Sequence, residues 1–584
     1  MQMIRETFDN KKVDNLYLED IDQFNELDGA TFSYWISKAV ADLMIVPMKT
    51  DYYLETRHGL VTGNGEKFMR LWHECDVNQI GIFDNTNNMG LKWYPYNKGG
   101  SFRRWYGNRE YVVNWQHNGM EIRNYKENDQ LKSSNYNLDY NFKPNISWSD
   151  IKSGLFSARY TPEGSLFDTS GPSLFLTNID NTMWVLGLLN TKVCQKILEV
   201  SCTGLHYTTG AVANIPVIDS LDKAFVAGLA ETALQICKDE WDSFENSWDY
   251  KRNPLASNNV RIKDVYETWK KACEERFSKL KETEEKLNKY VIEIYGLQDE
   301  LLPALEDQEI TIRRADVQRD IKALLSYSVG CMFGRYSLDH EGLAYAGGNW
   351  DTSKYSAFIP DADNVIPITD EEYLEDDIVS RLCSWLKVAF GESTLEENLD
   401  FIAMALDNKG SSSREIIRNY FLNDFFKDHC QTYSVTGSGK RPIYWLFDSG
   451  KQNGFKALIY LHRYNADTIG NLRIDYLHRM QRIYESEISR MQDMIDHSTS
   501  SREVAQATKR REKLTKQLKE CREYDEKMAH LALSRIELYL DDGVKINYRK
   551  VQTASDGKYY EVLADAKNIM ANDKLWKQYK EGKW

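Results

Sequence analysis

Cationic and aromatic side chains are concentrated between positions 92 and 126 of the chain. Seven lysines and arginines stand there among nine tryptophan, tyrosine and phenylalanine residues, and only Glu110 and Glu121 oppose them. Lysine and arginine neutralise phosphates, and flat rings stack on bases or pack against sugars. The segment therefore predicts contact with nucleic acid; the alternative is an aromatic-rich sheet whose charges simply face water.

Several residue types in this segment suit a DNA duplex. Paired arginines can form forked hydrogen bonds to phosphates or to guanine, and asparagine can pair with the edge of adenine. Glycine lets the DNA backbone come close. The candidate DNA-contacting residues are Lys92, Lys98, Gly99, Gly100, Arg103, Arg104, Tyr106, Asn108, Arg109 and Asn114. Trp105 and Trp115 are as readily assigned to a core as to the ligand.

Catalytic signals are weak. An enzyme that methylates amino groups needs an Asn/Asp-Pro-Pro-aromatic loop, but the Asn253-Pro254 pair is followed by Leu255. The stretch 437–440 (GSGK) lacks the spacing of a phosphate-binding P-loop and is interpreted as a turn. No cysteine or histidine spacing indicates a metal site. We therefore expect no catalytic residue, no metal and no cofactor in this chain.

The composition of the 584 residues is that of a globular protein with a net charge of −14 and a pI of about 5.4. This charge argues against a general polyanion binder, although a basic groove can lie on an acidic body. The nine cysteines are scattered, which favours a reducing cytoplasm over a disulfide framework. The polar start does not indicate a signal peptide, and no apolar run is long enough for a membrane span.

Turn residues and hydrophobic periodicity predict an α+β chain, whose first part is β-rich. Residues 1–57 are expected to form a connector with a helix near 32–43, capped by Thr31 or Ser33. Residues 58–217 form the β-rich domain. In it, 110–115 and 120–125 are predicted to pair as a hairpin across 116–119, and 180–200 is predicted to be helical.

The remaining parts are mainly helical. Residues 218–310 form a helical domain with helices at 224–238 and 264–295. Residues 311–470 are mixed α/β, with a helix at 316–332 and an acidic run at 361–377 that is expected to face water. Residues 471–584 form a long helical hairpin with a tail, in which a serine caps the returning helix after a turn at 497–501.

Several sequence blocks resemble a known family. The blocks at 59–74, 92–119 and 186–217 resemble the target-recognition region of large adenine-specific DNA methyltransferases, and the blocks at 239–255 and 287–301 continue the match. Those at 319–348, 440–468 and 539–548 narrow the resemblance to the PglX methyltransferases of BREX bacteriophage-defence systems. Together they cover nearly the whole chain.

The resemblance implies a division of labour. PglX proteins carry a methyltransferase domain that binds S-adenosylmethionine ahead of this region, so the chain is expected to be the C-terminal part and catalytically inactive alone. It would bind double-stranded DNA and choose the target sequence for N6-adenine methylation that marks host DNA as self. Further DNA contacts are implied for a loop with Thr62, Gly63 and Asn64, and for Lys440 and Arg441 with Lys451.

Two alternatives remain open. The chain is also interpreted as a protein-interaction scaffold that docks other BREX components or a phage DNA-mimic inhibitor through the acidic run or the long hairpin. An N-terminal methyltransferase domain or chain is a further expected partner, and a membrane is not. Methylation by this chain on its own lacks matching motifs.

Overall fold

The computed structural model describes residues 36–45, 54–82, 90–152, 154–256, 261–407 and 409–582. The first element is helix α3 (Lys38–Ile45), which overlaps the helix predicted near 32–43. The expected caps Thr31 and Ser33, and most of the predicted connector 1–57, lie outside the described residues.

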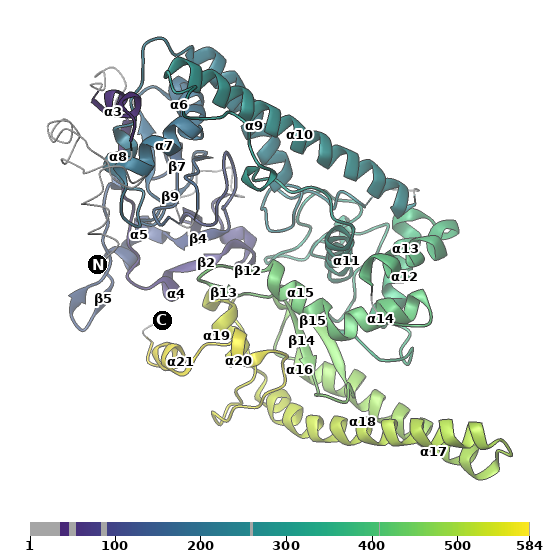
Figure 1. The fold of residues 1–584 in the computed structure, drawn as a ribbon. Helices are drawn as coiled ribbons and strands as arrows, with labels where there is room; N and C mark the ends of the chain where they lie inside the picture. The colour runs from purple at the N-terminus through teal and green to yellow at the C-terminus, as the bar shows by residue number, and fades with distance from the viewer. Residues whose placement is uncertain are drawn as a thin grey trace, which may run out of the picture.

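Two four-stranded sheets form the β-rich part (Figure 1). The antiparallel first sheet has the order β1 (Leu54–Arg57), β10 (Ser173–Leu176), β7 (Asn145–Ser147) and β8 (Arg159–Thr161). The second has the order β2 (Met69–Leu71), β4 (Tyr111–Asn114), β3 (Trp93–Asn97) and β9 (Leu166–Phe167), with β3 and β9 parallel. All five residues of β3 are buried, as expected for a central strand.

The predicted hairpin across 116–119 is wrong. Strand β4 pairs with β2 and β3, and helix α5 (Gln116–Arg123) follows it. His117, Asn118 and Gly119 have positive φ angles, so the Asn-Gly signal marks a kink in that helical segment instead of a hairpin turn. The hairpin lies further on, between β5 (Lys126–Glu127) and β6 (Gln130–Leu131).

Several helices pack against the first sheet. They are α6 (Thr182–Leu189), α7 (Lys192–Ser201), α8 (Thr209–Ala213), α9 (Lys223–Trp241) and α10 (Ile262–Ile294). Long helices near those predicted at 224–238 and 264–295 are confirmed as α9 and α10. The helix predicted at 180–200 is interrupted at Asn190, because Thr191 begins a new helix by accepting a hydrogen bond from the Cys194 N–H.

The next part combines helices with a small sheet. The helices are α11 (Val317–Phe333), α12 (Ile378–Phe390), α13 (Leu395–Leu406), α14 (Ser413–Asn423) and α15 (Phe425–Thr432). Strands β11 (Ile366–Pro367), β15 (Lys456–Tyr460) and β14 (Tyr444–Asp448) pair in that order. The helix expected at 316–332 is confirmed with Asp316 as its cap. Residues 437–440 lie in the hairpin of β12 (Ser434–Val435) and β13 (Gly439–Lys440), as predicted for a turn.

The acidic run at 361–377 is only partly a solvated surface. Asp377 is fully buried, caps α12 through the Ser380 N–H and forms an ion pair with Arg418. Asp361 is buried too, and burial together with Asp363 raises the pKa of its carboxyl to about 7. The prediction is wrong for these two residues because partners from outside the run compensate their charge.

A helical hairpin projects from the body at the lower right of Figure 1. It consists of α17 (His478–His497), preceded by α16 (Thr468–Asn471), and α18 (Ser501–Ser534). The predicted serine cap is confirmed, because Ser500 accepts from the Glu503 N–H. The returning stripe Leu514, Leu518, Cys521, Tyr524, Met528 and Leu531 is buried as predicted, whereas Ile474 is exposed. The tail adds α19 (Gly543–Lys550), α20 (Ala566–Ile569) and α21 (Asp573–Lys580).

Large apolar cores connect these elements. One joins the first sheet with α6, α7, α9 and α10, and another joins α11 to α15 with the small sheet and the hairpin. Helices and separate sheets in one chain confirm the α+β class. Within the described ranges, no helix combines the length and apolarity that crossing a bilayer requires.

Candidate functional site

The two arginines expected to contact DNA lie inside the molecule. Arg103 Nη2 is 2.5 Å from Glu240 Oε2 on α9, and Arg104 Nη1 is 2.7 Å from Glu284 Oε2 on α10. The two arginine side chains are only 10% and 6% exposed, and both carboxylates are buried. The expectation that they face a duplex is therefore corrected: they hold the β-rich part against the helices, because carboxylates distant in sequence neutralise them.

Most of the aromatic rings of the same segment belong to the protein core. Trp105 donates its indole N–H to Glu284 at 2.6 Å. Seven aromatic residues of the segment are buried: Trp93, Tyr94, Tyr96, Trp105, Tyr106, Tyr111 and Trp115. Stacking on bases needs an exposed ring face, which these buried residues lack. For these rings, the alternative interpretation of an aromatic-rich sheet is therefore confirmed.

Other candidates in the segment also make internal contacts. Asn108 is buried and donates to the Ser101 carbonyl, and the buried Asn114 donates to Glu121. Arg109 is half-buried; it donates to the Tyr106 hydroxyl at 2.6 Å and lies over the Trp248 ring. These side chains are therefore corrected from surface contacts to packing contacts.

Of the remaining candidates in the segment, Lys92, Lys98 and Gly100 lie nearer to the surface. Lys92 pairs with Asp541 at 2.8 Å, and Lys98 lies half-buried over the ring of Tyr111. Gly99 is buried, while Gly100 is exposed with a φ of 139°, which a side chain would rarely adopt. The backbone of this loop is therefore open at Gly100.

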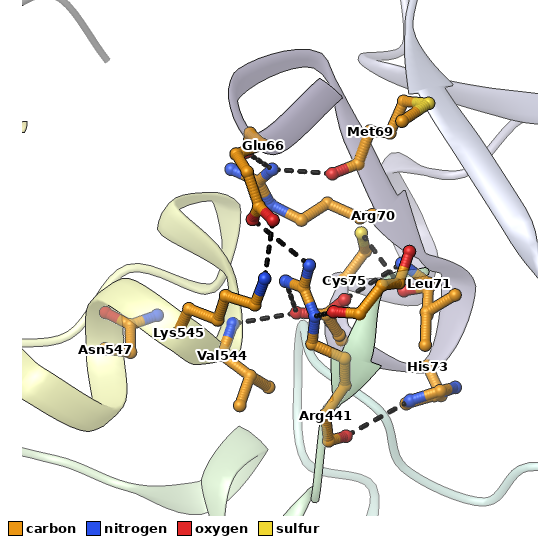
Figure 2. A network of polar contacts seen from close by, with 12 residues as sticks. Glu66, Met69, Arg70, Leu71, His73, Cys75, Arg441, Val544, Lys545 and Asn547 are labelled. Atoms are coloured by element: carbon orange, nitrogen blue, oxygen red, sulfur yellow. Dashed lines mark hydrogen bonds and ion pairs between the residues drawn. The ribbon is translucent and has the colours of Figure 1, made fainter. Parts of the chain in front are cut away.

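Arg441 is part of a buried polar network, which Figure 2 shows. Its guanidinium is 3.2 Å from Glu66 and 3.4 Å from Glu74, two residues on either side of β2. Glu74 is completely buried and also accepts the backbone N–H groups of Leu71 and Val544. Burial opposes the charge of Arg441, but Glu74 and Glu66 raise its pKa above the usual value.

The same network reaches the tail of the chain. Lys545 on α19 pairs with Glu66, and Arg70 donates to the Asp541 carbonyl at 2.7 Å. His73 contacts the Arg441 carbonyl, and burial lowers the pKa of His73 well below its ordinary value. The buried Arg441 and Glu74 thus join segments of the chain that are distant in sequence, so Arg441 is corrected from a DNA contact to a structural residue.

Lys440 and the loop before α4 (Gly65–Phe68) lie beside this network. Lys440 is partly exposed but forms an ion pair with Asp565. Thr62 is buried, and Asn64 caps α4 by accepting from the Lys67 N–H. Gly63 between them has a φ of 73°, so the loop turns sharply at the surface.

This loop borders a cleft of about 480 Å³ between the β-rich part and the tail. Gly63, Asn64 and Tyr125 form one side, and residues of α19 to α21 form the other. Figure 1 shows α21 and β5 on the same side of the molecule. Lysine side chains from the tail line the cleft: Lys545, Lys567 and Lys574. Glu66 and Glu127 are the acidic residues of its lining.

Lys567 and Lys574 were not among the DNA contacts predicted from the sequence, and both are exposed. A signal was present, because lysine and arginine outnumber aspartate and glutamate after position 542 in a chain that is acidic overall. No group of three or more histidine, cysteine, aspartate or glutamate side chains able to hold a metal ion occurs in the part of the chain that the structure describes.

Comparison with known proteins gives a consistent relationship. No protein-family model matches the chain. Two curated relatives, both named adenine-specific methyltransferases, match over nearly its whole length. The chain is thus related to adenine-specific methyltransferases.

The relatives are PglX of Lacticaseibacillus casei (strain Zhang) and BrxX of Escherichia coli O9:H4 (strain HS). The first is 41% identical over 557 residues, 93% of this chain and 46% of the relative. The second is 34% identical over 586 aligned residues, 94% of this chain and 46% of the relative. The resemblance to PglX is thereby confirmed, and the chain spans about half the length of these relatives.

Proposed function

We propose that this chain is the DNA-binding and target-recognition part of an adenine-specific DNA methyltransferase of the PglX type. The proposal is supported by two curated relatives that are named adenine-specific methyltransferases and match 93% and 94% of the chain. The Asn/Asp-Pro-Pro-aromatic loop of amino methylation does not occur in the sequence. Methyl transfer and S-adenosylmethionine therefore belong to a separate methyltransferase domain, and double-stranded DNA is the ligand of this part.

The lysine-lined cleft between loop 62–65 and the tail supports the proposed position of the DNA-binding surface. Lys567 and Lys574 are exposed cations from two short helices, and Gly63 brings backbone to the opposite side. Cations at such an edge release counterions from a duplex, and this release supplies most non-specific affinity. The duplex is proposed to contact this cleft instead of the internal arginines of the 92–126 segment.

Duplex binding over a range of salt concentrations tests this proposal. The double variant Lys567→Ala and Lys574→Ala should weaken binding, and its log–log salt slope should be smaller by about 1.8 if each lysine contacts one phosphate. The matched control is Lys509→Ala with Lys516→Ala, two exposed lysines on α18 that lie away from the cleft. The control should keep the parental slope.

Two results would contradict different parts of the proposal. Equal affinity and slope in the cleft variant and the parent would remove the cleft from the DNA surface. Lack of duplex binding by the parent at low salt would remove DNA recognition by this chain. Calorimetry with S-adenosylmethionine serves as a further check, since we expect no saturable binding to this chain alone.

A second candidate function is the docking of partner proteins. The α17–α18 hairpin projects from the body (Figure 1). Both of its helices carry many exposed charged side chains. Other BREX proteins or a phage DNA-mimic inhibitor are the proposed partners. Replacing the distal part of the hairpin, residues 488–508, by a short turn should abolish capture of purified BREX proteins while duplex binding persists; unchanged capture would exclude this hairpin.

A further inference from the structure

A short β-hairpin stands beside the lysine-lined cleft. Strands β5 and β6 pair antiparallel, with Lys126 opposite Leu131 and Glu127 opposite Gln130. Every residue from 126 to 132 is exposed, and Figure 1 shows the hairpin extending from the body. A two-stranded hairpin that buries neither face adds little stability of its own, so this exposure favours a role in binding.

The turn of the hairpin has a defined geometry. Asn128 and Asp129 are its two central residues, and their φ angles are 51° and 61°. Positive φ at both positions is typical of a type I′ turn, whose twist matches that of the paired strands. Asparagine and aspartate tolerate this conformation better than most residues do. The local sequence therefore favours a tight hairpin with a single register.

The base of the hairpin is fixed to the loop that borders the cleft. The Lys132 N–H donates to the Tyr125 carbonyl at 3.0 Å, and the backbone groups of Val61 and Ser134 exchange two hydrogen bonds. Asn64, which caps α4, donates through its side chain to the Tyr125 hydroxyl at 3.1 Å. These contacts hold the hairpin in a constant orientation beside the cleft, as a recognition element requires.

One face of the hairpin is directed to the cleft. Side chains alternate along a strand, so Glu127 shares a face with Tyr125, and both residues line the cleft. Gln130 lies opposite Glu127 and therefore belongs to the same face. Its Oε1 is 3.5 Å from Lys132 Nζ, a long and exposed contact that another hydrogen-bonding group can replace. The cleft side thus presents an amide, a carboxylate and an ammonium group.

The charge of the hairpin is balanced. Lys126 and Lys132 are matched by Glu127 and Asp129, so the net charge of residues 126–132 is zero. A segment that holds phosphates needs an excess of cations. Amide and carboxylate side chains on a neutral segment suit the edges of bases better, because base contacts and phosphate contacts have separate roles in recognition.

The dimensions of the hairpin suit the major groove of B-DNA. At about 3.4 Å per residue, the three residues from Tyr125 to Glu127 extend about 10 Å. The major groove is about 8.5 Å deep and about 12 Å wide, and it admits a two-stranded β-ribbon. With its base level with the phosphates, the hairpin would bring Gln130 to the base edges.

We propose that the β5–β6 hairpin enters the major groove of the duplex bound at the lysine-lined cleft, where Gln130 and Glu127 read bases. Gln130 would form paired hydrogen bonds with N6 and N7 of an adenine, and Glu127 would accept from N4 of a cytosine. Lys567 and Lys574 would contact phosphates of the same duplex. This inference rests on the proposed function and adds which residues choose the sequence.

Selection from a pool of duplexes with a randomised central segment tests the inference on the full chain. The duplexes bound by the parent should share a sequence that contains the adenine contacted by Gln130. Gln130→Ala should lose the preference at that one position by about 5- to 150-fold, the discrimination that a good bidentate base contact supplies. The matched control is Leu131→Ala, on the opposite face of the same strand, which should keep the sequence of the parent.

Salt dependence separates base reading from phosphate contact. Gln130→Ala removes no charge, so its log–log salt slope should equal that of the parent. Lys567→Ala with Lys574→Ala should instead reduce the slope and keep the preferred sequence. Gln130 and Leu131 are both exposed, so their variants should fold, and equal melting temperatures check this.

Four results would overturn the inference in distinguishable ways. The same enriched sequence and the same slope in Gln130→Ala and the parent would remove the hairpin from base recognition and leave DNA binding intact. An unchanged sequence with a smaller slope in that variant would assign Gln130 to the phosphates. Binding by the parent without any enriched sequence would refute target recognition as well. No binding by the parent at low salt would refute the proposed function and this inference together.

Discussion

The internal role of Arg104 makes a strong prediction about stability. Replacing Arg104 by Met leaves Glu284 buried without its cation, while the Trp105 indole N–H remains as its neighbour. Breaking a buried pair in this way costs about 3–5 kcal/mol. For a cooperative unit of roughly 150–250 residues, each kcal/mol lowers Tm by about 2–4 °C, so the variant should melt roughly 6–20 °C lower.

The assay combines thermal unfolding, followed by tryptophan fluorescence, with duplex binding below the transition. Adding Glu284→Gln should recover much of the lost stability, because the amide oxygen can still accept from Trp105 and no charge stays buried. Duplex affinity of the folded single variant should equal that of the parent. An unchanged Tm together with a tenfold loss of DNA affinity would refute the internal role and restore Arg104 to the DNA surface.

Two further predictions concern acid sensitivity and backbone packing. Burial, with Arg335 adding to it, lowers the pKa of His462 to about 3, although its contact with the Cys75 carbonyl opposes the shift. Below pH 6.5 the unfolded chain therefore binds a proton at His462, whereas the folded chain does not. The contribution of His462 to the free energy of unfolding is fully present above this pH and falls by about 1.4 kcal/mol per pH unit below it. Between pH 7.5 and 5.5 the free energy of chemical unfolding should fall by about 1.4 kcal/mol less in His462→Gln than in the parent. An equal fall in both proteins would show that His462 does not cause the acid sensitivity. Gly59→Ala should cost about 3 kcal/mol, because its Cβ would lie 1.9 Å from the Phe167 carbonyl oxygen, whereas Gly204→Ala meets no atom within 4 Å and should melt as the parent does.

Helices whose limits depend on local chemistry were predictable. Asp316 and Ser500 cap α11 and α18 through backbone groups three residues away, and such signals are contained within a short window. The stripe from Leu514 to Leu531 likewise repeats at helical spacing and is buried. The Asn118-Gly119 pair misled because the positive φ angles that favour a hairpin turn also suit a kinked helical segment.

The candidate site depended on pairings that spacing does not reveal. Glu240 is 137 residues from Arg103, and Glu284 is 180 residues from Arg104. A local excess of cations therefore indicated a surface that the tertiary structure neutralises from elsewhere. The composition of the 92–126 segment shows that it is rich in rings and charges, but it does not determine which of these side chains are exposed. That depends on how α9 and α10 pack against the segment.

The hydrogen bond between the Val544 N–H and Glu74 joins residues 470 positions apart. On a ribosome that adds about 5–20 residues per second, Val544 is synthesised roughly 20–90 s after Glu74. The region around β2 therefore lacks this contact until residue 544 has been synthesised. A stop codon before position 544 would thus deprive the Glu74 side chain of this hydrogen bond, although every residue of β2 is present.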